Sequence, residues 1–484
     1  MGTGKSERLR GTGKLLERRK QGNQTHWDPV EGREPPSNRG PGGRKMAVRQ
    51  GPKHISTQRL RIAELARRDR SRVLTALHHY IDLQWLHEAY HVTRKDGAVG
   101  IDGVTAQEYQ KNLMENLKSL LEGFKSGSYR APNIKRSYIP KGDGKKRPIG
   151  ITTFEDKVLQ RAVVMVLQEI YEQEFYDFSH GFRPGRSQHL AMKEAQDALK
   201  SLGKCWALEV DITGYFDNID HKHLRSCLDQ RVRDGVIRRM IDKWLRAGVM
   251  ESGQVTYSEV GTPQGGVASP LLSNIFLHYV LDDWFARIVL PRMRGKAKLV
   301  RYADDFILFF KEEEDAKRVQ KAVRRRFESV GLMLHPEKTQ LVRMAPPVGE
   351  GGERLKHEER GSLEFLGLTF FWGRHRKGSW EIRAKTSKKR MQKCLKKTAE
   401  WCRKNRHRKI RDQSVDLTKK LLGHYQYFGI SINLRALWEF RSQVIRIWKY
   451  WLSRRSGKKH LSWATFLRKT ERFPLPRPKI THWF

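Results

Sequence analysis

The chain has 484 residues, of which 38% are hydrophobic, so it can fill the cores of several packed units. Its 96 Lys and Arg outnumber its 53 Asp and Glu, and the net charge of +43 favours a polyanionic partner, with nucleic acid as the leading candidate. No segment approaches the ~20 apolar residues of a membrane span or resembles a secretory signal, and the four cysteines form no Cys-x-x-Cys pair, so we expect a soluble cytoplasmic protein without a zinc module or a disulfide framework.

The N-terminal part is expected to be a disordered basic arm followed by basic helices. Residues 1–52 combine Gly, Pro, Arg and Lys with almost no apolar periodicity. Met46 lies close to the start of the folded pattern, so translation from Met46 instead of Met1 is an alternative that the intact mass of the native protein would decide. From Gln58 to about Tyr90, leucine and isoleucine recur at helical spacing among arginines, which predicts helices with one apolar face.

A basic hairpin is predicted next. A glycine-rich loop over 97–103 and a helix over about 105–123 lead into strand-forming residues over 138–149 with a cationic turn between them. Lys141 and Arg147 would project from this hairpin, where they could bind phosphate groups. A solvated basic turn is the alternative for this segment taken alone.

A carboxylate follows the next predicted strand. After a helix over 157–171 and a basic loop at 180–187, the segment Cys205–Val210 is typical of a buried strand and ends at Asp211. A carboxylate at a strand end can meet the end of a neighbouring strand, which makes Asp211 a candidate site residue. A helix-capping turn is the alternative.

A second glycine-rich loop, Gly261–Pro270, carries Gln264. Its glycines let the backbone come close to a ligand, with Gln264 at the mouth of the site. Pro270 is expected to start a long apolar helix that ends near Arg287.

Two adjacent aspartates lie within the segment Leu299–Phe310. Apolar runs of strand-forming residues flank Tyr302-Ala303-Asp304-Asp305, which predicts a hairpin with both carboxylates at its tip. Two anions beside apolar strands are costly to desolvate unless a cation neutralises them, and a divalent metal ion does so compactly. We therefore predict a metal site; an ordinary acidic turn is the alternative.

The C-terminal part contains a strongly cationic helix. From Lys385 to Arg411, 13 Lys and Arg stand against one acid, yet an apolar stripe persists at helical spacing, which predicts a packed helix whose outer face binds nucleic acid. A merely solvated face is the alternative. The candidate RNA-binding residues are Lys388, Lys389, Lys396 and Lys397.

The other expected elements are a helix over 312–330, a strand after 331–339, a low-complexity insert at 346–361, a strand over 363–368, two helices carrying 417–428 and 434–451, and an extended tail at 473–478.

The predicted carboxylates suit phosphoryl transfer with two divalent ions. Asp211, Asp304 and Asp305 would hold the ions, one of which lowers the pKa of a primer 3′-hydroxyl while the other neutralises the leaving pyrophosphate. Mg²⁺ suits hard carboxylate oxygens and substrate phosphates.

The order of these motifs resembles that of bacterial group II intron reverse transcriptases, from about residue 58 to the C-terminus. The helical segment from about Asp412 is similar to the maturase region of that family, which binds intron RNA. The motifs that carry the resemblance are 139–148, 180–184, 211–217, 262–266, 302–305, 366–367, 423–429 and 473–476.

The resemblance implies an α+β fold arranged as a right hand of fingers, palm and thumb, with an antiparallel palm sheet and a helical maturase-like domain. The expected parts are a disordered basic arm (1–52), an N-terminal extension with the fingers (53–205), the palm (206–372), the basic first helix of the thumb (373–411) and the thumb with the maturase region (412–484).

The resemblance also assigns roles to single residues. Asp211, Asp304 and Asp305 match the metal-binding carboxylates, with the carbonyl of Ile212 as a further ligand of two Mg²⁺ ions. Phe216 matches the residue under the sugar of the incoming nucleotide, where a rigid ring would exclude a 2′-hydroxyl; core packing is the alternative. The matches to residues that bind the deoxynucleoside triphosphate are Lys141, Arg147, Gln264 and Lys338.

Some positions depart from the family pattern. Thr213 stands where the family often has lysine, and Ala268 where a larger aliphatic residue is common. The paired cysteines and histidines of an endonuclease module are not found after the maturase-like region. In this respect the sequence resembles the class C intron proteins. Such proteins would use DNA ends or single-stranded DNA as primers.

The function that the resemblance implies is that of an intron reverse transcriptase and maturase. Such a protein binds intron RNA, assists its splicing, and makes cDNA on an RNA template from primer or target DNA during intron mobility. The alternatives are a free-standing relative that serves defence or DNA repair, and an RNA-binding splicing factor without polymerase activity. The presence of Asp211, Asp304 and Asp305 argues against a splicing factor without polymerase activity.

Overall fold

The structure is a computed structural model that describes residues 51–140, 146–251, 254–257, 260–262, 265–347, 361–375, 377–455 and 461–484. The arm predicted over 1–52 lies outside these residues except for its last two positions, as do Lys141, Gln264 and most of the insert predicted at 346–361. No helix of the described part is both long enough and apolar enough to cross a membrane.

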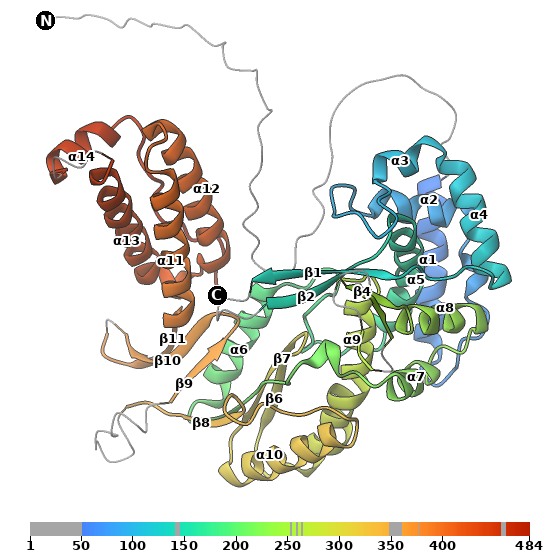
Figure 1. Cartoon of the computed structure of the whole chain (residues 1–484). Helices are drawn as coiled ribbons and strands as arrows, with labels where there is room; N and C mark the ends of the chain where they lie inside the picture. The colour runs from blue at the N-terminus through green and yellow to red at the C-terminus, as the bar shows by residue number, and fades with distance from the viewer. Residues whose placement is uncertain are drawn as a thin grey trace, which may run out of the picture. The chain divides into compact units, whose positions relative to one another are not determined.

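Helices dominate the first part of the described chain, as their apolar spacing predicts. They are α1 (Gly51–Arg68), η1 (His78–Tyr80), α2 (Leu83–Val92), α3 (Ala106–Lys111), α4 (Leu113–Ser126) and α5 (Phe154–Tyr171). α5 is buried along most of its length, and α1, α2 and α3 pack against it (Figure 1). The helix predicted over about 105–123 is divided in two, because the backbone of Asn112 departs from helical angles.

The predicted basic hairpin is confirmed and belongs to a mixed four-stranded sheet. In strand order, the sheet contains β2 (Lys146–Ile151), β1 (Ile134–Pro140), β4 (Val249–Glu251) and β5 (Gln254–Thr256). β1 and β2 are antiparallel, with Ile139 opposite Arg147, whereas β1 and β4 are parallel. Arg147 is therefore fixed on a paired strand.

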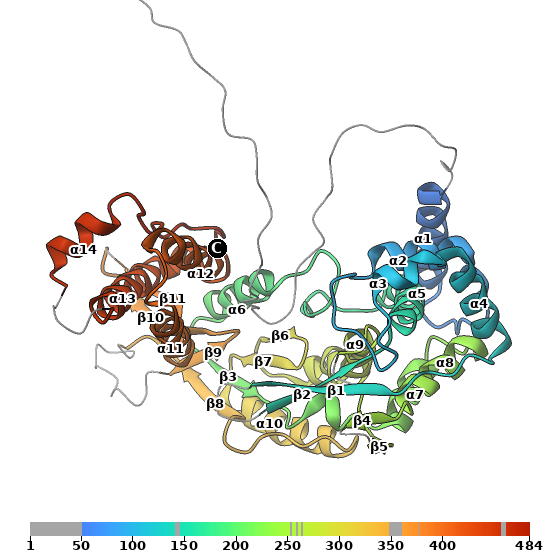
Figure 2. The same ribbon diagram turned by 45° about the horizontal axis from the view of Figure 1, so that its top comes forward.

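A four-stranded antiparallel sheet carries the predicted acidic residues. In strand order, it contains β6 (Ala297–Tyr302), β7 (Asp305–Phe310), β3 (Cys205–Val210) and β8 (Gln340–Met344). Side chains alternate between its faces: Leu208 and Leu308 share a core with α10 (Glu313–Glu328), whereas Ala207 and Phe309 share one with α6 (Gln188–Leu202). Figures 1 and 2 show these two helices on opposite faces of the sheet. Burial of both faces explains the nearly continuous apolar run of β7.

The apolar helix predicted from Pro270 is confirmed but is irregular. It starts as α9 (Ser269–Leu277) and continues through wider π-helical turns, η3 (His278–Asp282) and η4 (Phe285–Val289), to a final 3-10 turn, η5 (Leu290–Arg292). Such π-helical turns are frequent at functional sites. Two amphipathic helices lie between β3 and this segment, α7 (His221–Asp229) and α8 (Gly235–Leu245).

The single strand predicted over 363–368 is wrong, because this segment is a hairpin. Leu366 and Gly367 form the turn with φ values of 49° and 80°, and leucine rarely adopts such a positive φ. The resulting three-stranded sheet contains β9 (Ser362–Phe365), β10 (Leu368–Arg374) and β11 (Trp380–Thr386).

Helices follow this sheet to the C-terminal tail. They are α11 (Lys388–Asn405), α12 (Ile410–Phe428), η7 (Ser431–Asn433), α13 (Leu434–Ser453) and α14 (Trp463–Thr470). α11 and α12 both pack against α13, whereas α14 was not predicted. The tail after α14 is extended, as predicted.

The predicted α+β class with antiparallel sheets is confirmed, while the division into fingers, palm and thumb and the domain boundaries stay predictions. β3 contributes to both large apolar clusters of the described residues, one with the N-terminal helices and one with the C-terminal helices. The end of β3 is thus held by packing on both sides.

Candidate active site

The three predicted aspartates meet at one edge of the antiparallel sheet. β3 runs antiparallel to β7, so Asp211, which follows the last residue of β3, comes next to Asp305, the first residue of β7. Asp304 lies in the adjoining turn between β6 and β7. The pairing register therefore brings together residues that are far apart in the sequence.

The carboxylates influence one another's protonation. Loss of surrounding water raises the pKa of Asp304 and the charge of Asp211 adds to this, while Arg147 and Arg301 oppose it. Loss of water also raises the pKa of Asp305 to about 7, and the charges of Asp304 and Asp211 contribute to that shift. A cation bound among these groups would relieve their repulsion.

Two of the predicted nucleotide-binding cations lie at these carboxylates. Nζ of Lys338 donates to Oδ2 of Asp211 over 2.7 Å, although 61% of the lysine side chain is exposed. Arg147 on β2 is close enough to lower the pKa of Asp304 and of Asp305 against the effect of burial. Positive groups from two distant segments therefore border the aspartates, which suits a triphosphate ligand.

The donor set at this edge fits a divalent cation in its chemistry. Mg²⁺ prefers carboxylate and other oxygen ligands. The backbone N–H of His335 donates to the carbonyl of Asp211 over 2.7 Å, and the pairing between these segments leaves out the carbonyl of Ile212, which is compatible with its predicted role as a ligand. Within the described ranges, however, no three His, Cys, Asp or Glu residues lie close enough together to hold a metal ion, and Lys338 occupies one oxygen of Asp211.

The predicted sugar-contacting ring lies at the base of the second glycine-rich loop. Phe216 is half-buried in the short helix η2 (Tyr215–Asp217), and its carbonyl accepts a hydrogen bond from the backbone N–H of Thr262 over 2.7 Å. Gly261 is required here, because its φ is 92° and a Cβ would lie 2.9 Å from a backbone oxygen of η2. Gln264 follows two residues after Thr262, outside the described residues.

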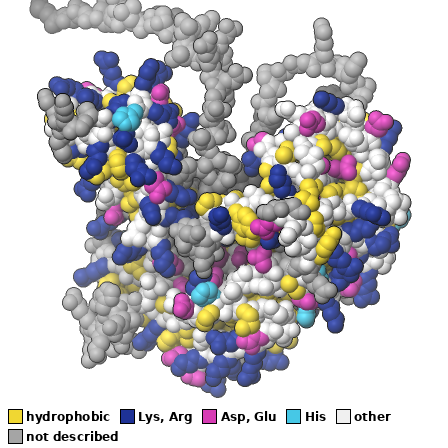
Figure 3. Space-filling view, in the orientation of Figure 1, with side chains coloured by type: hydrophobic (Ala, Val, Ile, Leu, Met, Phe, Trp, Pro, Cys, Tyr) yellow, Lys and Arg dark blue, Asp and Glu magenta, His cyan; other side chains and the backbone are white. Residues whose placement is uncertain are grey.

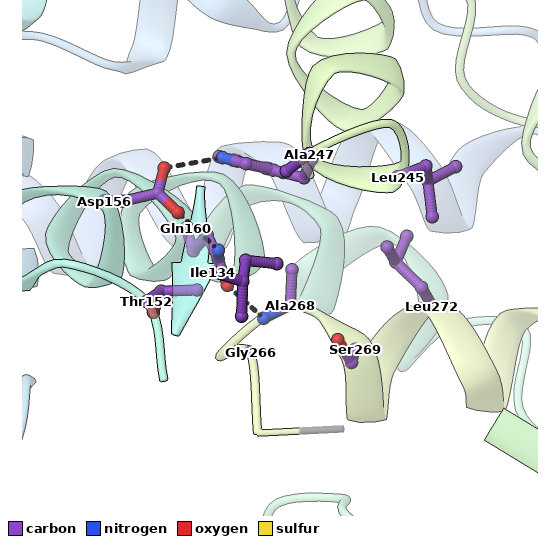
Figure 4. Close-up of a pocket in the computed structure, with 11 residues that line it drawn as sticks. Ile134, Thr152, Asp156, Gln160, Leu245, Ala247, Gly266, Ala268, Ser269 and Leu272 are labelled. Carbon is purple, nitrogen blue, oxygen red and sulfur yellow. Dashed lines mark hydrogen bonds between the residues drawn. The ribbon is translucent and has the colours of Figure 1, made fainter. Parts of the chain in front are cut away.

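A buried polar network behind this loop was not anticipated from the sequence (Figure 4). Oε1 of Gln160 accepts from the backbone N–H of Ala268 over 3.0 Å, and Nε2 of Gln160 donates to Asp156 over 2.8 Å. Asp156 also accepts from the indole N–H of Trp244 over 2.7 Å and from the hydroxyl of Tyr129 over 3.3 Å. Burial raises the pKa of Asp156 to about 6, and these hydrogen bonds oppose the shift. A cavity of about 20 Å³ beside the network has room for one water molecule.

Sequence reasoning passed over this network because each residue looks ordinary by itself. An acid and an amide four residues apart on the predicted helix are the signal that could have revealed it, since such residues lie on one face. Their partner Ala268 is 108 positions from Gln160, and nothing local connects the two.

α11 has the predicted amphipathic form. Thr398 and Cys402 are buried, and Lys and Arg side chains crowd the surface of the C-terminal helices, at the upper left of Figure 3. The four predicted RNA-binding lysines are all exposed: Lys388, Lys389, Lys396 and Lys397. Their contact with RNA stays a prediction.

Comparison of the sequence with known proteins identifies a matching family and several similar proteins. The family model described as reverse transcriptase (RNA-dependent DNA polymerase) matches residues 139–370. Protein YkfC of Escherichia coli (strain K12) is 32% identical over 337 residues, which are 63% of this chain and 87% of YkfC. The group II intron-encoded protein LtrA of Lactococcus lactis subsp. cremoris is 38% identical over 223 residues, which are 45% of this chain and 36% of LtrA. A 91 kDa protein in a cob intron of Schizosaccharomyces pombe is 34% identical over 200 residues, 41% of this chain and 24% of that protein.

These similarities agree with the resemblance drawn from the motifs. The matched family range contains all three aspartates, and the similar proteins include group II intron-encoded proteins and an intron maturase. The chain spans most of YkfC but little more than a third of LtrA. The chain belongs to the reverse transcriptase (RNA-dependent DNA polymerase) family, among the proteins of group II introns, as the order of its motifs predicts.

Proposed function

We propose that this chain extends a DNA primer on an RNA template with deoxynucleoside triphosphates. The observation that carries the proposal is the meeting of Asp211 with Asp304 and Asp305 at one sheet edge, bordered by Arg147 and Lys338. Clustered anions bordered by cations are the groups that phosphoryl transfer needs, since the chemistry consists of positioning and charge stabilisation.

The carboxylates of Asp211, Asp304 and Asp305 and the carbonyl of Ile212 would hold two Mg²⁺ ions. When bound, these ions would lower the pKa of the primer 3′-hydroxyl and neutralise the leaving pyrophosphate. Lys338 neutralises Asp211 through its ion pair, and it would exchange this partner for a phosphate oxygen when the nucleotide binds.

The remaining residues would orient the nucleotide. Arg147 and Lys141, from the β1–β2 hairpin, would grip the triphosphate, and Gln264 would line the pocket. Phe216 would lie under the sugar, and its half-buried position at the base of the glycine-rich loop supports this role.

The C-terminal helices would bind intron RNA, assist its splicing and support cDNA synthesis during intron mobility in the cytoplasm. The exposed lysines of α11 support this part of the proposal, because each phosphate that they neutralise releases counterions. A free-standing reverse transcriptase of defence or DNA repair would share the polymerase site without depending on an intron. A ribozyme sequence around the reading frame would favour the intron role.

Primer extension tests the polymerase directly. The full chain is incubated with an annealed RNA template and DNA primer, deoxynucleoside triphosphates and Mg²⁺, and products are resolved by length. Template-dependent extension is expected, and its absence with both Mg²⁺ and Mn²⁺ would overturn the proposal. A self-splicing assay on the flanking RNA, with and without the protein, separates the intron role from the free-standing alternative.

A further inference from the structure

A charged side chain lies fully buried beside the aspartate turn. Arg301, on β6, donates from Nε and Nη2 to the two carboxylate oxygens of Asp282 over 2.8 and 2.5 Å, and Asp282 is fully buried as well. Nη1 of Arg301 donates to Oδ1 of Asn274 over 2.9 Å and to the carbonyl of Ala303 over 3.0 Å. The guanidinium thus links the α9–η3 segment to the turn that contains Asp304.

The turn that receives this hydrogen bond has an unusual backbone. Ala303 has a φ of 57°, in the left-handed region that residues with a Cβ rarely adopt. A Cβ on Gly181 would lie 2.3 Å from the backbone nitrogen of Ala303, so only glycine allows this close approach. Nδ2 of Asn274 donates to the carbonyl of Gly181 over 2.6 Å. Arg301 and Asn274 therefore hold both segments that shape the turn.

A contribution to folding stability does not by itself explain why Arg301 and Asp282 form a buried ion pair. Burying two charges removes their hydration, and apolar residues of similar volume often stabilise a core equally well or better. A guanidinium instead offers a rigid fork, so the two bonds to Asp282 fix the direction in which Nη1 points. The charge of Arg301 also favours the ionised form of Asp304.

We propose that Arg301 is a positioning residue of the polymerase site, whose guanidinium, fixed by Asp282 and Asn274, holds the strained turn at Ala303 and so directs the carboxylate of Asp304 toward the other two aspartates. This role rests on the proposed metal-dependent DNA synthesis. Removing the guanidinium should weaken metal binding beyond any effect on folding.

The test uses the full chain with Arg301→Met and Asp282→Leu combined, because removing both partners leaves no buried charge unpaired. Mn²⁺ binding, measured by electron paramagnetic resonance of the free ion, is expected to weaken roughly 10- to 100-fold, the usual effect of losing a group that orients metal ligands. The kcat of primer extension should fall by a similar factor, with a smaller change in the KM for nucleotide. Arg301→Lys keeps the charge but cannot contact Asp282 and Ala303 together, so it should weaken Mn²⁺ binding as well.

A second buried ion pair provides the matched control. Nε of Arg231 lies 2.9 Å from Glu174, and its Nη atoms donate to backbone carbonyls at the end of α1, so these partners all lie outside the aspartate turn. Arg231→Met combined with Glu174→Leu should shift the melting temperature to a similar extent while leaving Mn²⁺ affinity unchanged. Asp304→Asn sets the lower limit of Mn²⁺ binding.

The outcomes separate this role from the proposed function. Parental Mn²⁺ affinity and kcat in the Arg301 double variant would overturn the positioning role and leave the polymerase assignment intact. A parent that neither binds Mn²⁺ nor extends primers would overturn both. If the double variant does not fold, Arg301→Lys decides by the same readouts: weakened Mn²⁺ binding supports the role, and parental binding overturns it.

Discussion

The acidic tip of the β6–β7 hairpin and the cationic face of α11 are both strongly charged, but they are built in different ways. At the tip, Asp304 is half-buried in a turn with fixed backbone contacts, and burial together with the charge of Asp211 raises its pKa. On α11 the lysines are exposed along a regular helix that buries only Thr398 and Cys402 among its described residues.

The difference separates two uses of charge. If the tip holds a cation as proposed, binding depends on where a single carboxylate points, so one neutral substitution of the same shape should be decisive. If α11 binds RNA as proposed, the attraction sums over many exposed lysines, so each would contribute little and salt would screen them all. Mutations that remove charge without changing shape can therefore test the two regions separately.

The largest effect is expected at the tip. Asp304→Asn keeps the shape of the side chain but removes the charge, and primer extension should fall on the order of 10³-fold, as for loss of a key electrostatic group. RNA affinity, measured by filter binding, should stay close to that of the parent, because the C-terminal helices are unchanged.

Asp177→Asn is the control for this substitution, since its side chain is 95% exposed and lies outside the site. It should leave extension unchanged. Full activity in Asp304→Asn would show that the carboxylate does not act on a metal ion.

The second effect tests the α11 face. Replacing Lys388, Lys389, Lys396 and Lys397 with alanine should lower the slope of log affinity against log salt by about 3 units if all four contact phosphates of single-stranded RNA. Intron splicing assisted by the protein should weaken in parallel, while extension of a short primer on a saturating template should change little.

A matched loss of charge is available on α10, where Lys317, Lys321, Arg324 and Arg325 are exposed. Their replacement with alanine should leave the salt slope nearly as in the parent. If both quadruple variants flatten the slope equally, the net charge of the chain and not the α11 face governs RNA binding.

Local patterns predicted the acidic tip well, because the apolar runs around Asp304 and Asp305 specify a hairpin without reference to other segments. The turn at Leu366 was missed, since a leucine with positive φ contradicts its own preference and is imposed by the pairing of β9 with β10. The partners of Arg301 and Gln160 were also missed. Each bonds a residue on another element, 19 and 108 positions away, and only the packed fold brings these groups together.

The third effect concerns the shape of the proposed sugar-binding position. If the ring of Phe216 lies under the sugar, Phe216→Val should raise the incorporation of ribonucleotides relative to deoxyribonucleotides by roughly 10- to 100-fold, because the clash with a 2′-hydroxyl is removed. Steady-state incorporation of single nucleotides measures this ratio. Phe178→Val is the control, since Phe178 is another half-buried ring on the same apolar core. A uniform fall with both sugars would assign Phe216 to packing.

The smallest effect concerns a carboxylate that differs from those at the tip, because Asp156 is bound mainly by neutral donors. Its pKa is raised from 3.8 to about 6 in the folded chain, so the folded state binds more protons than the unfolded state between these values. Stability should therefore fall as pH rises through this window, by on the order of 1–3 kcal/mol. Asp156→Asn cannot ionise and should lose this part of the pH dependence, which denaturant unfolding across the same window measures.

Asp156→Asn should also disturb the glycine-rich loop that carries Gln264, a proposed nucleotide-binding residue, because the change reaches Ala268 through Gln160. Nε2 of Gln160 donates to Asp156, whereas an asparagine amide turned toward Gln160 would present a second donor. If Gln160 rotates to offer its oxygen, its Nε2 then faces the backbone N–H of Ala268, and the hydrogen bond to the loop is lost. Loss of one such bond corresponds to roughly a 2- to 10-fold rise in the KM for nucleotide, with kcat nearly unchanged. A parental KM combined with a flattened pH dependence would show that Gln160 does not position the loop.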